Sequence, residues 1–243
     1  MLNQNRLLQA LSPIEHQRLL PLLEYVPMQR GWLLNRPGDE AYLYFPTTST
    51  ISLLIVMGDG DSWEGAVIGN DGLVGTSLLT GVLDDDTIAE VQTAGGSYRI
   101  NASLLKKDAA STDALRDLAT RYMHALTTQM TQTGACSRHH RIEQQLSRWI
   151  LLRLDRLKSH EIAITQGELG MLLGVRRQLV AAGIESLQTA GILEYTRGKI
   201  KVLTRPQLEA QACECYQVIR QETERMFASV NAIKGKNIRP GRR

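Results

Sequence analysis

Hydrophobic positions change their spacing several times along the 243-residue chain, and each change predicts a different kind of element. Residues 5–24 carry leucines on one helical face, and Ser12-Pro13 with Glu15 is typical of a helix start. Over residues 26–100 the apolar runs become short and glycine-rich turn signals separate them. This spacing predicts an antiparallel barrel or sandwich. The expected strands are 32–34, 41–45, 50–56, 66–68, 88–91 and 97–100.

Helical spacing returns towards the C-terminal end, where two short helices are expected around a glycine. The first apolar helix ends at Gly174, and a second follows with Val180, Ile184 and Leu187 at i, i+4 and i+7. Gly170 has no side chain and would let the two helices cross closely. One face of the second helix is therefore expected to be buried.

Two β-prone runs follow this pair of helices and flank Arg197-Gly198, a two-residue turn with glycine in its second place. Helix, tight turn, helix and β-hairpin together form the winged helix-turn-helix arrangement. In that arrangement the second helix enters a DNA major groove.

The charges of this region favour the same use. Arg176, Arg177 and Gln178 stand at the start of the second helix, and no acidic residue precedes Glu185. Arginine can donate to both major-groove acceptors of guanine, and glutamine can pair with adenine. The alternative is an ordinary solvated pair of helices with a basic face. The β-hairpin that follows the second helix, and the basic residues at the start of that helix, make us favour DNA binding. Expected phosphate contacts are Thr165, Gln166, Arg197, Lys199 and Lys201.

A longer helix is expected between the barrel and the helix-turn-helix, at residues 111–135, with a break around Gly134. It either packs on the barrel or pairs with its copy in a second subunit. We favour pairing, because major-groove readers usually bind paired half-sites as two-fold dimers. The predicted interface residues are Leu115, Leu118, Tyr122, Met123, Leu126 and Met130. A basic helix at about 138–157 and another at 206–230, opened by Pro206, complete the helical pattern.

Net charge divides the chain into unequal parts. Residues 1–137 hold 9 Lys and Arg against 15 Asp and Glu, whereas residues 138–207 hold 12 against 6. An acidic front and a basic back fit a sensor or scaffold joined to a nucleic-acid module. No run approaches the roughly 18 apolar residues that cross a membrane, and no secretory core is present. We therefore expect a cytoplasmic protein associated with the nucleoid.

The three cysteines predict neither a disulfide framework nor a metal site. Cys136 precedes His139 and His140 by helical spacing, but it lies at the expected helix break and lacks a fourth ligand nearby. Cys213 and Cys215 on one helix would point about 200° apart, at 100° per residue. They could not bind one ion in that conformation, and we expect one to be buried and the other peripheral.

The order of these parts resembles the Crp–Fnr superfamily of bacterial transcription regulators over nearly the whole chain. The residues that carry the resemblance are Leu11-Ser12-Pro13-Ile14-Glu15, Gly31-Trp32-Leu33-Leu34, Pro37-Gly38-Asp39-Glu40, Tyr44-Phe45, Thr165-Gln166-Gly167-Glu168-Leu169-Gly170, Gly174, Gly191-Ile192 and Arg197-Gly198-Lys199-Ile200. The resemblance implies an α+β fold: an effector-binding double-stranded β-helix, a long dimerisation helix and a C-terminal winged helix. Where the family's founding pattern presents Arg-Glu and then Arg, this chain has Arg177, Gln178 and Ala182, so its operator should differ.

The chain departs from the cyclic-nucleotide-binding members of that superfamily. In them, a glutamate after a glycine holds the ribose, and an arginine with a serine or threonine holds the cyclic phosphate. Here the corresponding run begins Gly75-Thr76-Ser77, and Asp85 and Asp86 stand about where the arginine and serine belong. Adjacent carboxylates repel a phosphate. We expect an acidic surface loop on a vestigial effector barrel, and no response to cyclic AMP.

Other cofactors of the superfamily are not expected either. Its oxygen sensors hold an iron–sulfur cluster through N-terminal cysteines, and this chain has no cysteine before Cys136. Haem needs an axial ligand, and His16 and His124 are interpreted as ordinary surface or interface residues. No P-loop, nucleophile elbow or HExxH pair indicates an enzyme.

These patterns predict a barrel at 1–110, a dimerisation helix at 111–135, a winged helix-turn-helix domain at 138–230 and a basic, disordered tail at 231–243. The expected function is a homodimeric regulator that binds paired half-sites on double-stranded DNA and acts with RNA polymerase. One rival is a small-molecule or nucleotide sensor whose winged helix serves protein contacts. Another is a metal-dependent enzyme that uses the acidic loop at 84–86.

Overall fold

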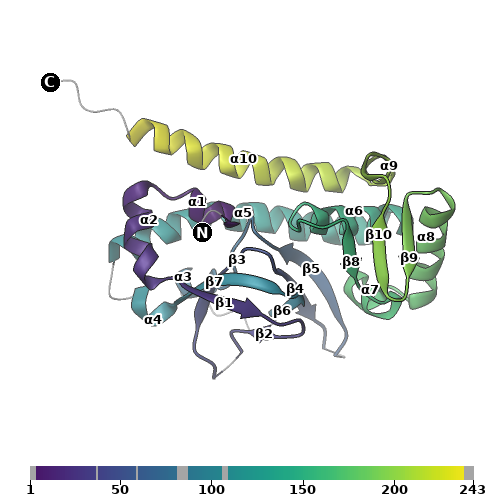
Figure 1. Cartoon of the computed structure of the whole chain (residues 1–243), viewed down its shortest axis with the longest axis horizontal. Coiled ribbons are helices and arrows are strands. Elements are labelled where there is room, and N and C mark those ends of the chain that lie inside the picture. The colour runs from purple at the N-terminus through teal and green to yellow at the C-terminus, as the bar shows by residue number, and fades with distance from the viewer. Residues whose placement is uncertain (1–3, 37, 59, 81–86, 106–108, 238–243) are drawn as a thin grey trace.

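Two antiparallel sheets form the N-terminal half of the chain and face each other as a barrel (Figure 1). The computed structural model describes residues 4–36, 38–58, 60–80, 87–105 and 109–237. One sheet has the order β1-β7-β3 and the other β2-β6-β4-β5. The strands are β1 (Glu24–Met28), β2 (Leu33–Leu34), β3 (Tyr42–Pro46), β4 (Thr50–Val56), β5 (Ser62–Ile68), β6 (Thr87–Thr93) and β7 (Gly95–Asn101).

The strands predicted for the barrel are all present, and one barrel strand was missed. β1 contains Pro27, which weakens a strand prediction, yet Val26 and its neighbours pair with β7. The predicted helical segment 5–24 is divided into α1 (Arg6–Gln9), α2 (Pro13–Leu19) and the 3-10 helix η2 (Leu20–Leu22). Ser12 accepts a hydrogen bond from the backbone of Glu15, whose carboxylate accepts one from the Ser12 amide, so the expected capping box is confirmed.

Two short helices follow strands of the barrel, and one long helix leads to the C-terminal domain. α3 (Ser77–Thr80) and α4 (Ala102–Leu105) are short, and α5 (Ala109–His139) runs along the barrel before α6 (Ile142–Leu154) begins. The predicted break at Gly134 is wrong, because α5 continues through it to His139. A single glycine costs a helix only about 1 kcal/mol, which surrounding contacts can offset.

The C-terminal domain begins with α6 and contains a third sheet, three-stranded and of order β8-β10-β9. Its elements are β8 (Glu161–Ala163), α7 (Gln166–Leu173), α8 (Arg177–Thr189), β9 (Leu193–Thr196), β10 (Lys199–Val202) and α9 (Arg205–Gln211). The single helix expected at 206–230 is two helices, because the helical conformation is interrupted at Ala212-Cys213. Pro206 does open the first of them.

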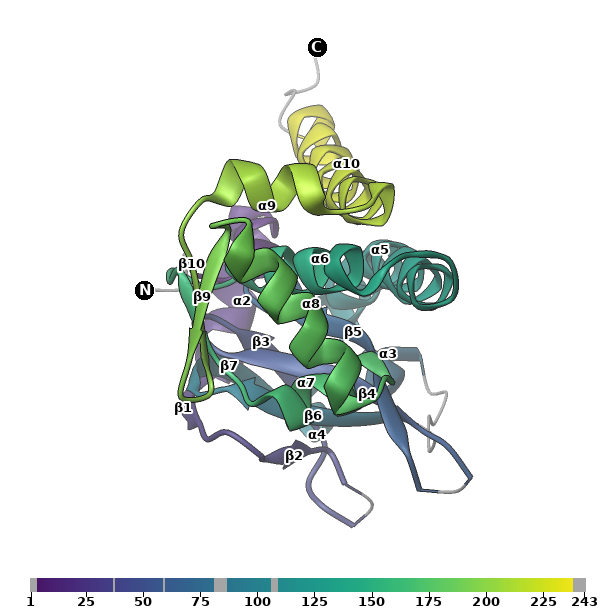
Figure 2. The same cartoon turned by 90° about the vertical axis from the view of Figure 1, so that its right-hand side faces the viewer.

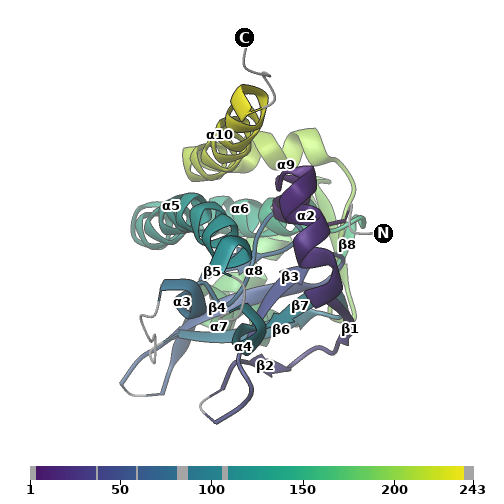
Figure 3. The same cartoon turned by 90° about the vertical axis from the view of Figure 1, so that its left-hand side faces the viewer.

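The last helix, α10 (Glu214–Asn237), returns along α5, as Figures 1 and 3 show. It extends into the segment 231–243 for which composition predicted disorder, so that prediction is wrong over 231–237. Alanine and lysine are good helix formers, and the first proline of this segment comes only at residue 240, which explains the continuation. No helix in the described ranges is both long and apolar enough to span a membrane.

Two buried arginines tie the C-terminal domain to the barrel. The Arg153 guanidinium, from α6, donates to Glu64 on β5 and to Ser52 on β4, with Nη1–Oε1 and Nη2–Oγ distances of 3.1 and 3.3 Å. It also stacks on the Trp149 ring, 3.4 Å from the ring centroid. Just beyond α6, Arg156 pairs with Asp71 at 2.8 Å. Through these contacts α6, a helix of the C-terminal domain, packs directly against the barrel.

Removing one partner of the Arg153–Glu64 pair should be far more damaging than removing both. Glu64→Leu leaves a buried guanidinium unpaired and should lower the free energy of unfolding by about 3–5 kcal/mol. The double variant Glu64→Leu with Arg153→Met should recover most of this stability. Urea unfolding measures both, and Arg36→Ala, which removes an exposed ion pair to Asp39, is the control that should cost less than about 1 kcal/mol. A Glu64→Leu variant as stable as the control would contradict this expectation.

Candidate nucleic-acid interface

The two short helices α7 and α8 form a helix-turn-helix with well-defined ends. α7 starts at Thr165, whose hydroxyl accepts from the amide of Glu168 at 3.2 Å while the Glu168 carboxylate accepts from the Thr165 amide at 2.8 Å. The helix ends at Gly174, which adopts the left-handed φ of +66°. Val175 and Arg176 then lead into α8. The predicted position of the turn is confirmed.

Close approach at two glycines sets how α8 packs. A Cβ on Gly170 would lie 2.9 Å from the carbonyl oxygen of Val175, so only glycine lets α7 sit this close to the turn. A Cβ on Gly183 would lie 2.6 Å from Leu146 Cδ1 and 3.1 Å from Ile142, both on α6. The first of these close approaches was predicted from the sequence and the second was missed. The sequence feature that could have predicted the second close approach is Gly183 itself, a glycine within the otherwise regular apolar face of the helix.

The two faces of α8 differ as the spacing predicted. Val180, Ile184 and Leu187 are buried in a core that also includes Leu54 and Val67 of the barrel. The opposite face is exposed at the end of the molecule, where Figure 2 shows α8 lying across the view. The four predicted base-reading residues, Arg176, Arg177, Gln178 and Ala182, are all exposed, and so is the apolar side chain of Leu179 between them.

The wing is a tight hairpin with alternating side chains. Arg197 and Gly198 both have positive φ, 52° and 76°, which defines a two-residue turn suited to the strand twist. Ile200 and Val202 are buried while the two lysines between and before them, Lys199 and Lys201, are exposed. The turn and the exposed basic side chains of the wing therefore match the prediction; β8, the third strand, was not predicted.

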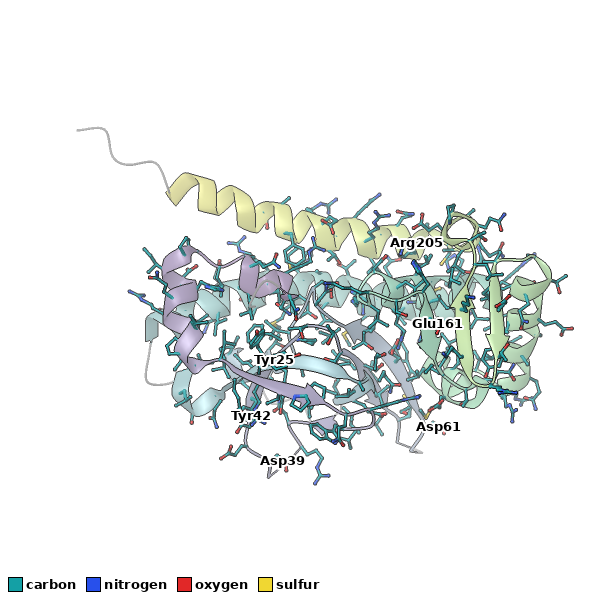
Figure 4. The ribbon with its side chains drawn as sticks, viewed as in Figure 1. Tyr25, Asp39, Tyr42, Asp61, Glu161 and Arg205 are labelled. Carbon is teal, nitrogen blue, oxygen red and sulfur yellow. The ribbon has the colours of Figure 1, made fainter. Side chains whose placement is uncertain are left out.

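One wing lysine already has a partner. Lys199 Nζ lies 2.9 Å from a carboxylate oxygen of Glu161 on β8, labelled in Figure 4. The lysine's hydrogen bond and charge lower the pKa of Glu161 below its ordinary value. Both side chains are about half exposed, so the pair is weak and a stronger anion can compete for the lysine.

The start of α7 is held against the barrel. Glu168 also accepts from Arg30, in the connection between β1 and β2, at 2.7 Å. Thr165 is exposed and Gln166 half-buried. The hydroxyl of Thr165 is used within the capping box, so a phosphate at this position would meet chiefly the amides and the glutamine.

The β4–β5 hairpin also reaches the helix-turn-helix. A cleft of about 730 Å³ separates them; Met57, Asp61 and Trp63 line its barrel side, and Gly174 and Arg176 line the other. Figure 4 labels Asp61 in this hairpin. The first residue of the candidate base-reading face thus borders the barrel, which the sequence pattern did not predict.

Much of the basic excess of residues 138–207 is internal. Arg148, Arg153 and Arg156 are buried, and Arg205 pairs with Asp155 and Glu209. Charge counting alone could not separate these structural arginines from exposed ones. Cations of this stretch that are at least partly exposed include Arg138, Arg141, Lys158, Arg176, Arg177, Arg197, Lys199 and Lys201.

A separate cavity of about 260 Å³ lies between the barrel and α5. Gly75, Thr76 and Ser77, the start of the degenerate cassette, line one side of it. The rest of its described lining is aliphatic or neutral, and no charged side chain is among it. Asp84, Asp85 and Asp86 lie outside the described residues, so the acidic loop stays a prediction.

The apolar stripe of α5 faces the chain's own barrel. Leu115, Leu118 and Tyr122 are 0%, 4% and 6% exposed within a single chain, so they cannot contact a second copy in this conformation. Leu126 and Met130 are half-buried and line the cavity. Of the predicted interface, Met123 is the most exposed at 37%. Packing on the barrel, the alternative interpretation of the stripe, accounts for the buried members.

The structure brings the three cysteines together, which corrects two expectations. Cys136, Cys213 and Cys215 are all buried, and with His140 their ligand atoms lie within 4.8 Å of one another. Cys213 precedes α10 instead of lying on a continuous helix, so its sulfur and that of Cys215 converge. A hydrogen bond from Cys136 lowers the pKa of Cys213.

Comparison with known proteins agrees with this geometry. Residues 144–211 match the family described as the Crp-like helix-turn-helix domain. A search of curated proteins finds no match. Among solved structures, a putative transcriptional regulator of the crp/fnr family from Eubacterium rectale is 16% identical, with a TM-score of 0.64, and the match covers 86% of this chain and 98% of that one.

Two further solved structures have the same fold. A CRP-family transcriptional regulator from Thermus thermophilus is 16% identical with a TM-score of 0.62, covering 77% of this chain and 96% of that one. The c-di-GMP responsive global regulator CLP of Xanthomonas campestris is 18% identical with a TM-score of 0.57, covering 79% and 100%. Sheets, long helix and helix-turn-helix therefore follow one shared arrangement.

Proposed function

We propose that this chain, which carries a Crp-like helix-turn-helix domain within a Crp/Fnr-type fold, is a homodimeric transcription regulator that binds specific sequences of duplex DNA. The observation that carries the proposal is the exposed, basic first turn of α8 within the matched segment. The regulator acts at the nucleoid in the cytoplasm and with RNA polymerase. The proposal includes no catalytic activity.

Base reading is assigned to the exposed face of α8. Arg176 and Arg177 suit the paired acceptors of guanine, and Gln178 suits adenine. Ala182 lies one helical turn further on and suits contact with a thymine methyl group. Because Val180 and Ile184 fix the opposite face in the core, the reading side chains are held at a constant orientation.

Phosphate contacts are assigned to the wing and to the start of α7. Arg197 sits at the tip of the hairpin, and Lys199 and Lys201 project from its exposed side. Thr165 and Gln166 stand at the N-terminus of α7, where backbone amides favour an anion. DNA binding at the wing would exchange the Lys199–Glu161 pair for a lysine–phosphate pair.

The competing function is a sensor whose winged helix contacts another protein. Its specific support is the barrel cavity, which is lined by neutral and aliphatic groups and could accept a small apolar molecule. The two functions differ in salt dependence, because release of counterions makes DNA binding weaken steeply with salt. A protein with no salt-dependent affinity for duplex DNA would favour the sensor.

DNA binding should not require a cyclic nucleotide. The described lining of the cavity offers no cation to a cyclic phosphate, and burial of an unpaired phosphate is costly. Calorimetric titration with cyclic AMP, cyclic GMP and c-di-GMP should show no micromolar binding, and operator affinity should be unchanged by any of them. Micromolar binding coupled to tighter DNA binding would overturn this part of the proposal.

We place the dimer interface on the flank of α5 that carries Met123 and Thr127, which are exposed and also line the barrel cavity. Figure 2 shows α10 and the barrel on two other sides of this helix. Met123→Glu with Thr127→Glu should put unpaired charges into the interface and give folded monomers. Gln17→Glu, on the exposed side of α2, is the control and should stay dimeric. Sedimentation velocity measures the mass of both; an intact dimer of the double variant would move the interface elsewhere.

Base reading and phosphate binding should separate in two variants. Arg177→Ala removes an interaction worth about 1–3 kcal/mol of discrimination, so it should weaken operator binding roughly tenfold or more and relax one position in each half-site. Lys199→Ala should weaken operator and scrambled duplexes alike. It should lower the salt slope by about one unit for each lysine–phosphate pair removed, or about two units in a symmetric dimer.

The comparison uses fluorescence anisotropy on both duplexes across a salt series. Glu161→Gln, which frees Lys199 from its carboxylate partner, is the matched control and should strengthen binding to both duplexes. Equal weakening on both duplexes for Arg177→Ala would refute its role as a base reader. Weakening confined to the operator for Lys199→Ala would reverse the assignment of the wing.

A further inference from the structure

Four potential metal ligands meet where the two domains join. Cys136 lies on α5, His140 follows α5, Cys213 precedes α10, and Cys215 lies in its first turn. Cys136 Sγ and Cys213 Sγ are 3.5 Å apart, and Cys215 Sγ is 3.7 Å from His140 Nδ1. The three cysteines are buried, and they form a small cluster of their own within the protein interior.

These distances fit one tetrahedral ion. Zinc binds sulfur at about 2.3 Å and imidazole nitrogen at about 2.0–2.1 Å, which in a tetrahedron places neighbouring ligand atoms roughly 3.5–3.8 Å apart. The four ligand atoms all lie within 4.8 Å, so small side-chain shifts would complete the tetrahedron. A cluster of several irons would need its cysteines further apart. Three thiolates and one imidazole form a ligand set that structural zinc sites use.

The histidine is oriented as a ligand usually is. Its Nδ1 faces the sulfur of Cys215, while its Nε2 lies 3.2 Å from a carboxylate oxygen of Glu214. Ligating histidines generally donate their other ring N–H to a carboxylate or carbonyl, which fixes the tautomer. Glu214 supplies that acceptor here and leaves Nδ1 free to bind the ion.

A buried charge beside the cluster points to the same occupant. Arg148 is only 4% exposed; it donates to Thr133 Oγ1 at 3.0 Å, its Nε has no hydrogen-bond partner, and its charge acts on the thiol of Cys136. No carboxylate pairs with it among the described residues. Three thiolates around one divalent ion carry a net charge of −1. That charge would balance the guanidinium, whose burial without a counter-charge is costly.

We propose that Cys136, His140, Cys213 and Cys215 bind one zinc ion, which fastens the start of α10 to the junction of α5 and α6. Each of the three thiols loses its proton on binding, and the imidazole binds as the neutral form. The ion would join segments more than seventy residues apart in the chain and hold α10 along α5. This inference does not depend on DNA binding.

The test uses full-length protein and the metal alone. After removal of metal under reducing conditions, Zn²⁺ should bind at one equivalent per chain, measured by elemental analysis after gel filtration. Co²⁺ should give the intense visible bands of a tetrahedral ion and a near-ultraviolet sulfur-to-metal band. His140→Ala and Cys215→Ser should lose these bands, while His139→Ala, an exposed neighbour, should keep them.

A second readout guards against variants that fail to fold. A chelator should lower the thermal midpoint of wild type and of His139→Ala, and should leave that of His140→Ala unchanged. Three results would each overturn the proposal: metal-free wild type that takes up no zinc, equal cobalt spectra for the two histidine variants, or a Cys136–Cys213 disulfide in protein isolated from reducing cytoplasm.

Discussion

The rest of the structure depends on buried arginine–carboxylate pairing between α6 and the barrel. Arg153, on α6, pairs with Glu64 of the barrel. Arg156, just beyond the end of α6, pairs with Asp71 of the barrel domain. Inside a protein, a charge without its partner costs several kcal/mol, so neither domain can move away cheaply from the other. Such pairs specify a relative placement more strictly than apolar contacts do, because they require direction as well as burial.

This constraint also fixes where α8 and the wing lie. α8 packs on α6 through Gly183, and the wing follows α8 in the chain. Because the ion pairs fix α6 against the barrel, they also fix the positions of α8 and the wing. The barrel hairpin that carries Trp63 lies beside the turn at Gly174. The same hairpin and Arg176, at the start of α8, line one cleft, so the barrel and the helix-turn-helix are in direct contact there.

The sequence was sufficient wherever a local signal had one physical meaning. Ser12 with Glu15, Gly174, and Arg197-Gly198 each specify a cap or a turn, and the structure confirms them. It was insufficient where tertiary contacts decided. The stripe containing Leu118 fits a dimer seam or a barrel contact equally well, and only the fold shows that it is buried internally. Likewise, Cys213 joins Cys215 only because the helix breaks before residue 214, which periodicity did not indicate.

Recognition of a paired DNA site by α8 is tested most directly by selecting bound duplexes from a random pool with the purified full-length protein. We predict a two-fold symmetric sequence whose half-sites are about 10 base pairs apart from centre to centre, or a multiple of that spacing. We also predict that the sequence is selected without any added small molecule. Recovery of no sequence above the level of the starting pool would contradict this function.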